Sequence, residues 1–143
     1  AATLPELIGE EKIGQMTHDQ VHTFAHLSLI NEGGGKFSTQ HLPNMAQLSP
    51  LMGALLTDLN ADGLTDLVGV GNRYQMDWDF PRCDAGAGVV LLGQGKGQFE
   101  AVPWAQSGLF APGDTRQVAK VRTLSGQMLV VAQRDGKVRV FEE

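Results

Sequence analysis

Short apolar runs separated by glycine-rich or polar turns set the hydrophobic pattern of this chain. Four such runs cover residues 52–57, 66–71, 88–92 and 98–102. Runs of this length bounded by turn residues are typical of strands, and successive strands joined by tight turns pair antiparallel. The pattern therefore predicts a four-stranded antiparallel meander, with a long excursion over residues 72–86 between its second and third strands.

Weaker patterns flank this meander on both sides. Residues 4–16 mix apolar and charged positions at helical spacing, and Pro5 suits a first helical turn, so we expect a short helix or two turns there. Strands are then expected over residues 21–31 and 36–42, and after the meander over 116–122, 128–133 and 137–141. The turns between these last strands are expected at Ser125-Gly126 and, as a type I′ hairpin, at Asp135-Gly136.

Oxygen-bearing side chains alternate along the loop between the first two strands of the meander. Calcium takes roughly six to eight oxygen ligands from carboxylates, amides and backbone carbonyls, and alternate residues of a tight loop can point to one centre. Gly63 supplies the turn, because glycine reaches positive φ without steric cost. The expected calcium ligands are the side chains of Asp58, Asn60, Asp62 and Asp66 and the backbone carbonyl of Leu64.

Two other interpretations of this loop compete with the calcium hairpin. An EF-hand begins with the same residue types, but it needs a bidentate Glu at the twelfth loop position and helices on both sides. Counting from Asp58, that position is Gly69, and the flanks have the pattern of strands. The remaining alternative is a polar turn whose Asp and Asn side chains bond their own backbone and hold no ion.

These motifs carry a resemblance to a known family. Residues 58–67, followed by Gly71-Asn72, resemble the FG-GAP/VCBS repeat, D-x-[DN]-x-D-G-x-x-D-[LI]-x-x-x-[GN]. Residues 29–37 and 91–99 resemble that family's L-x-N-x-G-x-G-x-F hairpin. Residues 84–86 and 108–110, with Gly113-Asp114 and Arg116, resemble the C-terminal portion of bacterial VCBS proteins of the CRTAC-like kind. The resemblance implies integrin-α-like β-propeller blades, in which each blade is a four-stranded antiparallel meander.

The resemblance also implies how the chain divides as a single segment. Residues 1–50 would hold the helix and the end of one blade, 51–105 a full blade with the calcium loop, and 106–143 an incomplete last blade. A closed propeller has about 4–8 blades, so an all-β partial propeller with a short N-terminal helix is expected. Unpaired blade edges invite other strands, so we expect self-association, as a symmetric dimer that joins edges or covers exposed faces.

Composition narrows the function classes. The formal charge of −5 argues against a nucleic-acid partner, which normally meets a basic stripe. The single cysteine, Cys83, excludes an internal disulfide, and no run approaches the length of a membrane-spanning helix. The chain starts without Met and shows no signal peptide, which suggests a processed or excised product. A secreted, periplasmic or cell-surface location, in a bacterium, is what the family resemblance implies.

Two further groups of residues are weaker candidates for a site. His18, His22 and His26 recur every four residues; surface or half-buried histidines are expected, and their role stays open. Loops that carry aromatic and charged residues often bind partners, which makes the excursion a candidate site, although a structural loop pinned by Asp–Arg pairs is the favoured interpretation. The candidate partner-binding residues are Asp77, Trp78, Asp79 and Arg82.

No catalytic motif is present in the sequence, so the expectation is a binding protein, not an enzyme. The favoured function is a calcium-binding propeller segment that acts as an extracytoplasmic binding or adhesion scaffold for a protein or glycan. The alternative is an accessory, carbohydrate-binding part of a secreted carbohydrate-active enzyme whose catalytic residues lie outside this chain. Both rest on the analogy of fold and not on a defined site.

Overall fold

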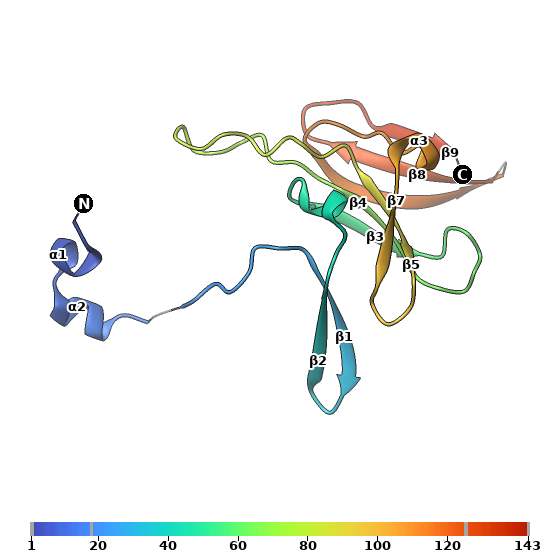
Figure 1. Cartoon of the computed structure of the whole chain (residues 1–143). Helices are drawn as coiled ribbons and strands as arrows, with labels where there is room; N and C mark the ends of the chain where they lie inside the picture. Colours follow the sequence, from blue (N-terminus) through green and yellow to red (C-terminus); the bar gives the residue numbers. More distant parts are fainter. Residues whose placement is uncertain (1, 18, 125, 143) are drawn as a thin grey trace.

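The computed structural model describes residues 2–17, 19–124 and 126–142, and it shows a mostly β protein (Figure 1). The described strands form three separate antiparallel sheets of two, four and three strands, and none of these sheets closes on itself. Short helices precede and connect the sheets. The predicted predominance of antiparallel strands and the short N-terminal helix are therefore confirmed.

Short helical segments and strands alternate in groups along the chain. The helical segments are α1 (Leu4–Ile8), α2 (Glu10–Gln15), the 3-10 turn η1 (Asn44–Gln47) and α3 (Trp104–Ser107). The strands are β1 (Leu27–Gly33), β2 (Lys36–His41), β3 (Gly53–Thr57), β4 (Asp66–Val70), β5 (Val89–Gly93), β6 (Phe99–Val102), β7 (Thr115–Thr123), β8 (Gly126–Gln133) and β9 (Arg139–Glu142).

The central sheet is the meander that the sequence predicts, with strands in the order β3-β4-β5-β6. Its strands β4 and β5 are apolar at nearly every position because both faces of the sheet are covered. On one face, Val68 and Val90 pack in a core completed by β7 and β8. On the other face, Leu67 and Leu91 pack against the segment around η1. Near-continuous apolar strands are the usual signature of a sheet buried on both sides.

The β1–β2 hairpin lies against the turn between β5 and β6. The Ser28 hydroxyl donates a hydrogen bond to the Gly97 carbonyl at 2.6 Å, and Ile30 fills the space where a side chain at position 97 would stand. Gly97 also has a φ of +72°, a conformation that favours glycine. This close approach explains why the second glycine hairpin keeps a glycine at that position.

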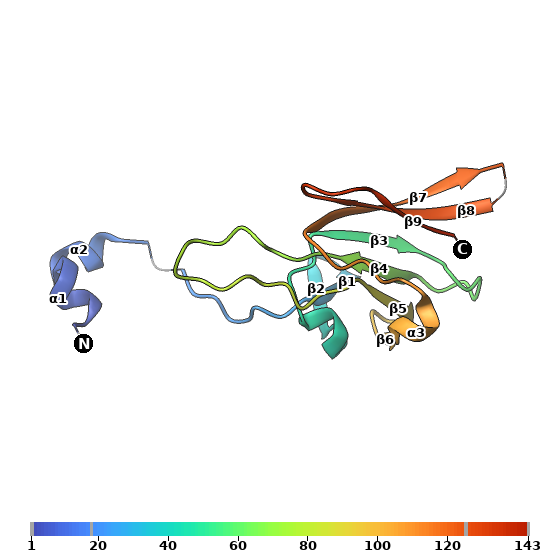
Figure 2. The same ribbon diagram turned by 90° about the horizontal axis from the view of Figure 1, so that it is seen from above.

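The three-stranded sheet β7-β8-β9 packs over the central sheet, and Figure 2 shows the two layers from above. Val118 and Val131 contribute its buried side chains. The last turn differs from the prediction, because β9 begins at Arg139 instead of residue 137. Of the pair Asp135-Gly136 only Asp135 has a positive φ, +53°, so the tight type I′ turn is wrong and a longer turn stands in its place. The expected turn at Ser125 lies outside the described residues.

The N-terminal region departs most from the sequence prediction. The strand expected from residue 21 begins only at Leu27, and no β pairing precedes it in the described part of that segment. Val21 and Phe24 are consequently 64% and 93% exposed. In both ribbon views α1 and α2 lie apart from the sheets (Figures 1 and 2). Residues 21–26 have strand propensity without a neighbouring edge, and an unpaired strand is not stable in water.

Substitution of a core leucine tests the two-faced central sheet. Leu91→Ala on β5 removes a fully buried side chain and is expected to lower the free energy of unfolding by about 2–5 kcal/mol. The matched change Leu56→Ala, on the 61% exposed side chain of β3, should cost less than about 1 kcal/mol. Urea denaturation of both variants measures the difference, and equal losses would contradict the assignment of the core.

Candidate functional site

The candidate calcium loop spans residues 58–65 and connects β3 to β4 in a hairpin. Its end strands pair in register from Gly53 opposite Val70 to Thr57 opposite Asp66. The hairpin therefore holds the ends of the loop together. All of the predicted side-chain ligands come from this loop or from the first residue of β4.

Hydrogen bonds inside the loop turn its polar side chains back on the loop backbone. The Asp58 carboxylate accepts from the Gly63 amide at 3.0 Å, and the Asp62 carboxylate accepts from the Leu64 amide at 2.7 Å. The Asn60 side chain accepts from the Asp62 amide at 3.2 Å and donates to the Asp62 carboxylate at 2.8 Å. These bonds are those of the polar-turn alternative, and they involve three oxygen-bearing side chains of one short loop.

Asp66 has a different environment from the other predicted ligands. Its side chain is fully buried, and its two carboxylate oxygens accept the amides of Leu59 and Gly93, each at 2.8 Å. Gly93 can approach this closely because it has no side chain. Any side chain at this position would collide with the carbonyl of Thr65. Asp66 thus joins the loop after β3 to the turn after β5. A buried charge is tolerated when hydrogen-bond donors surround it.

The donor set still fits a hard cation. Within the described residues no three Asp, Glu, His or Cys side chains converge as a metal-binding group, although calcium also accepts amide and carbonyl oxygens. Each carboxylate oxygen offers about two lone-pair sites, so one amide bond leaves room for a second partner. Asp58, Asn60 and Asp62 are exposed, which leaves them open to an ion from solvent.

The excursion between β4 and β5 forms a second, protruding loop. Backbone hydrogen bonds in both directions between Arg73 and Cys83, at 2.8 and 3.0 Å, close its base. Three of the predicted partner-binding residues lie at its far end, where the Phe80 amide donates to the Asp77 carbonyl at 2.9 Å. Trp78 is 97% exposed, and Asp77 and Asp79 are exposed beside it.

Arg82, the fourth predicted residue, is engaged near the base of the same loop. Its guanidinium lies 3.2 Å from the Asp84 carboxylate and 4.8 Å from the centre of the Tyr74 ring. Both contacts are largely solvent-exposed, so they steer the loop more than they stabilise it. The structure therefore places Arg82 near the base of the loop, while Asp77, Trp78 and Asp79 lie at its tip.

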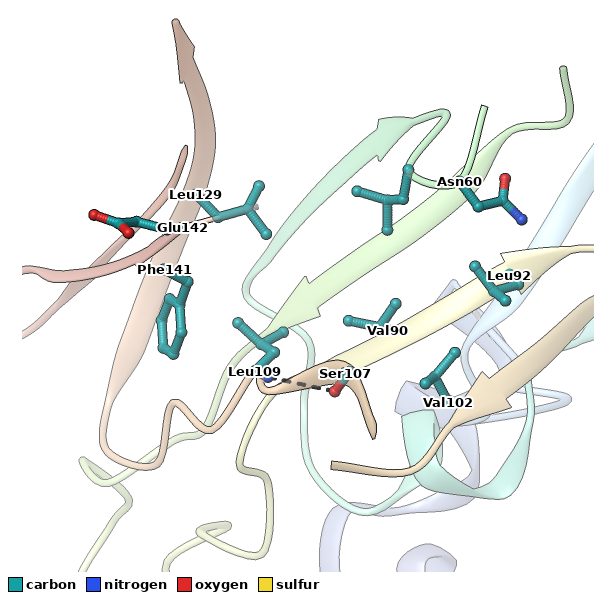
Figure 3. A pocket seen from close by; sticks show the side chains of 10 residues that line it. Asn60, Val90, Leu92, Val102, Ser107, Leu109, Leu129, Phe141 and Glu142 are labelled. Carbon is teal, nitrogen blue, oxygen red and sulfur yellow. Dashed lines mark hydrogen bonds between the residues drawn. The ribbon is translucent and has the colours of Figure 1, made fainter. Parts of the chain in front are cut away.

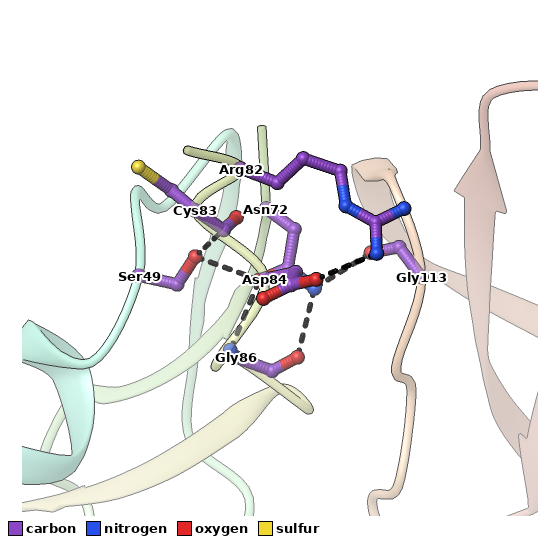
Figure 4. A network of polar contacts seen from close by, with 7 residues as sticks. All are labelled: Ser49, Asn72, Arg82, Cys83, Asp84, Gly86 and Gly113. Carbon is purple, nitrogen blue, oxygen red and sulfur yellow. Dashed lines mark hydrogen bonds and ion pairs between the residues drawn. The ribbon is translucent and has the colours of Figure 1, made fainter. Parts of the chain in front are cut away.

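Asn72, which the sequence analysis did not select as a site residue, organises the base of the excursion (Figure 4). It is fully buried, and its side-chain nitrogen donates to the carbonyls of Gly86 and Gly113, each at 2.8 Å. Its side-chain oxygen accepts from the Gly86 amide at 3.0 Å and from the Ser49 hydroxyl at 2.6 Å. All four hydrogen-bonding positions of the amide are filled. The local signal was its place two residues after the end of β4, but its hydrogen-bond partners are distant in sequence.

The structure describes two of the three histidines that the sequence analysis singled out. His18 lies outside the described residues, and His22 is exposed. His26 is half-buried, and its Nε2 accepts the Leu51 amide at 3.2 Å, which places the proton of a neutral ring on Nδ1. These positions agree with surface and half-buried histidines.

An apolar cavity of about 270 Å³ opens between the central sheet and the three-stranded sheet. Figure 3 shows Leu129 and Phe141 on one side of it and Val90, Leu92 and Val102 on the other. Leu59 and Asn60 of the candidate calcium loop also line this cavity. No sequence signal pointed to this cavity, because its lining residues come from segments that are distant in sequence.

Comparisons of this chain with models of protein families, with curated proteins and with solved structures find no match. The resemblance to FG-GAP/VCBS repeats accordingly rests on the motifs within the chain. Among the described residues, the helices are all too short or too polar to cross a membrane.

Removal of the Asn72 side chain tests whether it holds the base of the excursion. Asn72→Ala leaves buried groups of Gly86 and Gly113 without their partner, so we expect a loss of stability on the order of 2–4 kcal/mol. The control is Asn44→Ala, at an exposed position of η1. Thermal melts followed by circular dichroism compare the two, and an unchanged melt for Asn72→Ala would contradict the role.

Proposed function

We propose that this chain is a calcium-stabilised segment of consecutive FG-GAP/VCBS-type β-propeller blades that serves as an extracytoplasmic binding scaffold. The observation that carries the proposal is the donor-rich hairpin loop that ends at buried Asp66. It combines the nine-residue motif with the β-hairpin context in which this family places its calcium. The chain would bind a protein or a glycan through its loops and perform no catalysis itself.

The order of the sheets along the chain supports the blade interpretation. The four-stranded meander follows a hairpin, β1–β2, and precedes a second meander, β7–β9, which packs over it. Neighbouring blades of a propeller pack face to face in that order, with short connections. The first strands of the two meanders, β3 and β7, lie side by side. They approach so closely that a side chain at Gly53 would meet the backbone of Gln117.

Apolar side chains that are exposed on the first and last sheets also favour a longer propeller. Leu29 and Phe37 on the β1–β2 hairpin are 64% and 59% exposed. Val121 and Val140 on the outer face of the β7–β9 sheet are 41% and 54% exposed. Contiguous exposed apolar positions mark surfaces that meet another protein surface. Further blades of the same kind would cover both faces.

The exposed tip of the excursion supports a glycan as the partner. Trp78 presents almost its whole side chain to solvent, and Phe80 is 59% exposed two residues later. Flat aromatic faces with polar neighbours offer a stacking surface and hydrogen-bond acceptors together. The same observation favours the alternative, an accessory carbohydrate-binding part of a secreted carbohydrate-active enzyme, since both functions would use this tip.

Calcium titration is the direct test of the loop. Isothermal titration of the metal-free protein should give a heat of binding with one site, and Asp62→Ala should abolish it. A ligand at a hundredfold excess over its Kd stabilises the folded state by about 2.7 kcal/mol, which corresponds to a rise in Tm of roughly 5–15 °C for a domain of this size. Magnesium at the same concentration should bind much more weakly, because it demands a small octahedral site.

The control for that experiment is Asp79→Ala, which removes an exposed aspartate outside the loop. It should keep both the heat of binding and the rise in Tm. No heat from the parent protein at millimolar calcium would show that the loop is the polar turn alone.

The excursion is tested by binding to an array of neutral and acidic oligosaccharides. Trp78→Ala should weaken any binding by about tenfold or more, as loss of an exposed aromatic anchor does. Phe110→Ala, at a 55% exposed aromatic that contacts Trp104 away from the excursion, is the matched control. Glycan binding that survives Trp78→Ala would place the partner site elsewhere.

A further inference from the structure

Loops from both meanders meet at one end of the sheets. The excursion leaves β4 and returns to β5 at that end, residues 113–114 lead into β7 there, and residues 134–138 join β8 to β9. The candidate calcium loop lies at the opposite end (Figure 1). Blades that stack on the faces of the sheets do not cover the ends of the strands, so the proposed stacking leaves this loop surface open.

Two hollows adjoin on this surface, because Gln75 lines both of them. The first hollow, of about 380 Å³, runs along the excursion and is lined by Arg73, Asp77 and Phe80 together with Gln75 and its neighbour Met76. The second hollow, of about 290 Å³, lies between the excursion and the second meander. Its other walls come from residues 113–114 and 133–136. A ligand that filled both hollows would therefore contact both meanders.

Alternate residues of the excursion present polar side chains to these hollows. Arg73, Gln75 and Asp77 are exposed, and Tyr74 and Met76 between them are half-buried. This alternation is that of an extended segment, in which every second side chain points to the same side. The Arg73 guanidinium and the Asp77 carboxylate have no hydrogen bond or ion pair within the described part of the chain, so both are available to a ligand.

The charges around the two hollows cancel. Two guanidinium groups and two carboxylates are exposed there, and the buried carboxylate of Asp114 has the Arg116 guanidinium at 2.7 Å. An anionic ligand would meet the exposed carboxylates, whereas a neutral ligand finds donors and acceptors in equal measure. The four exposed charges belong to Arg73, Asp77, Arg134 and Asp135.

Phe80 gives the first hollow an apolar wall. Its side chain is 59% exposed and lies two residues beyond Trp78 at the tip of the excursion. The C–H face of a pyranose ring packs on an aromatic ring, and its hydroxyl groups both donate and accept hydrogen bonds. An aromatic ring beside a free guanidinium and a free carboxylate meets both needs of a sugar unit.

The second hollow offers a comparable set of polar groups. The Arg134 guanidinium donates to the side-chain oxygen of Gln75, which links the excursion to the turn between β8 and β9. The side-chain nitrogen of Gln75 has no partner among the described residues, so it can donate to a ligand. Asp135 supplies an exposed acceptor in the same hollow.

We propose that the two hollows are adjoining subsites for a neutral oligosaccharide. One sugar unit packs on Phe80 between Arg73 and Asp77, and the next unit lies beyond Gln75, toward Arg134. This inference rests on the proposed glycan-binding function, and it extends that site from the tip of the excursion to the loops of the second meander.

Isothermal titration with sugars of increasing length tests the two subsites. The probes are the oligomers of glucose, mannose and xylose, each from the monosaccharide to the hexasaccharide. In the series that binds best, affinity should rise about tenfold or more with length, because only a longer chain fills both hollows. The hexamer of galacturonate, which is acidic, should bind about tenfold more weakly than the best neutral hexamer.

Substitution of the exposed polar side chains locates the ligand. Arg73→Ala and Gln75→Ala should each weaken binding of the best hexasaccharide by about tenfold, because each variant removes hydrogen bonds to the sugar. Both side chains are exposed, so the fold and the Tm should not change. The matched controls are Arg122→Ala and Gln127→Ala, which remove exposed side chains at the other end of the β7–β9 sheet and should bind the sugar as the parent does.

The outcomes separate this inference from the proposed function. Binding that is lost in Trp78→Ala but unchanged in Arg73→Ala and Gln75→Ala would keep the glycan site at the tip and would overturn the two subsites. Preference for the galacturonate hexamer would overturn the neutral ligand and leave a glycan-binding function. Failure of the parent chain to bind any of these sugars would overturn the inference together with the glycan partner, and the calcium titration would still decide the scaffold.

Discussion

The central sheet has to bury both of its faces, and the rest of the molecule is arranged around that requirement. Successive residues of a strand point to opposite faces, so β4 and β5 send Val68 and Val90 into one core and Leu67 and Leu91 into the other. Neither core could form from the four strands alone. The segment around η1 covers one face and the β7–β9 sheet covers the other. The meander is consequently the middle layer of the chain and not an independent unit.

A sheet without a polar face must place its polar groups at its ends, and buried polar side chains stand at both ends of β4. Asp66 at its start holds the loop after β3 to the turn after β5. Asn72, just beyond its end, holds segments near Ser49, Gly86 and Gly113 together. The two candidate functional loops begin at these two anchors. The candidate calcium loop leads into Asp66, and the excursion with Trp78 leads out of Asn72, so the buried core sets the position of both loops.

The sequence predicted the features that depend on nearby residues. Alternation of apolar runs and glycine turns was sufficient for the meander, and helical spacing with Pro5 was sufficient for the helical N-terminus. It failed where the decisive partner is remote. Residues 21–26 have strand propensity but meet no edge, and the four hydrogen bonds of Asn72 join segments up to forty-one positions away. The cavity could not be predicted for the same reason, since its lining residues come from two sheets that are distant in sequence.

Asp66 is both a residue of the predicted calcium motif and a structural residue of the central sheet. Its carboxylate is compensated by two amides, so the sheet does not require an ion in order to bury that charge. The carboxylates of Asp58 and Asp62 carry like charges that repel each other. Both side chains are exposed, so water and salt screen this repulsion. A bound calcium would therefore act on the loop more than on the sheet. It would replace the hydrogen bonds within the loop by coordination and fix the wall of the cavity that Leu59 and Asn60 form.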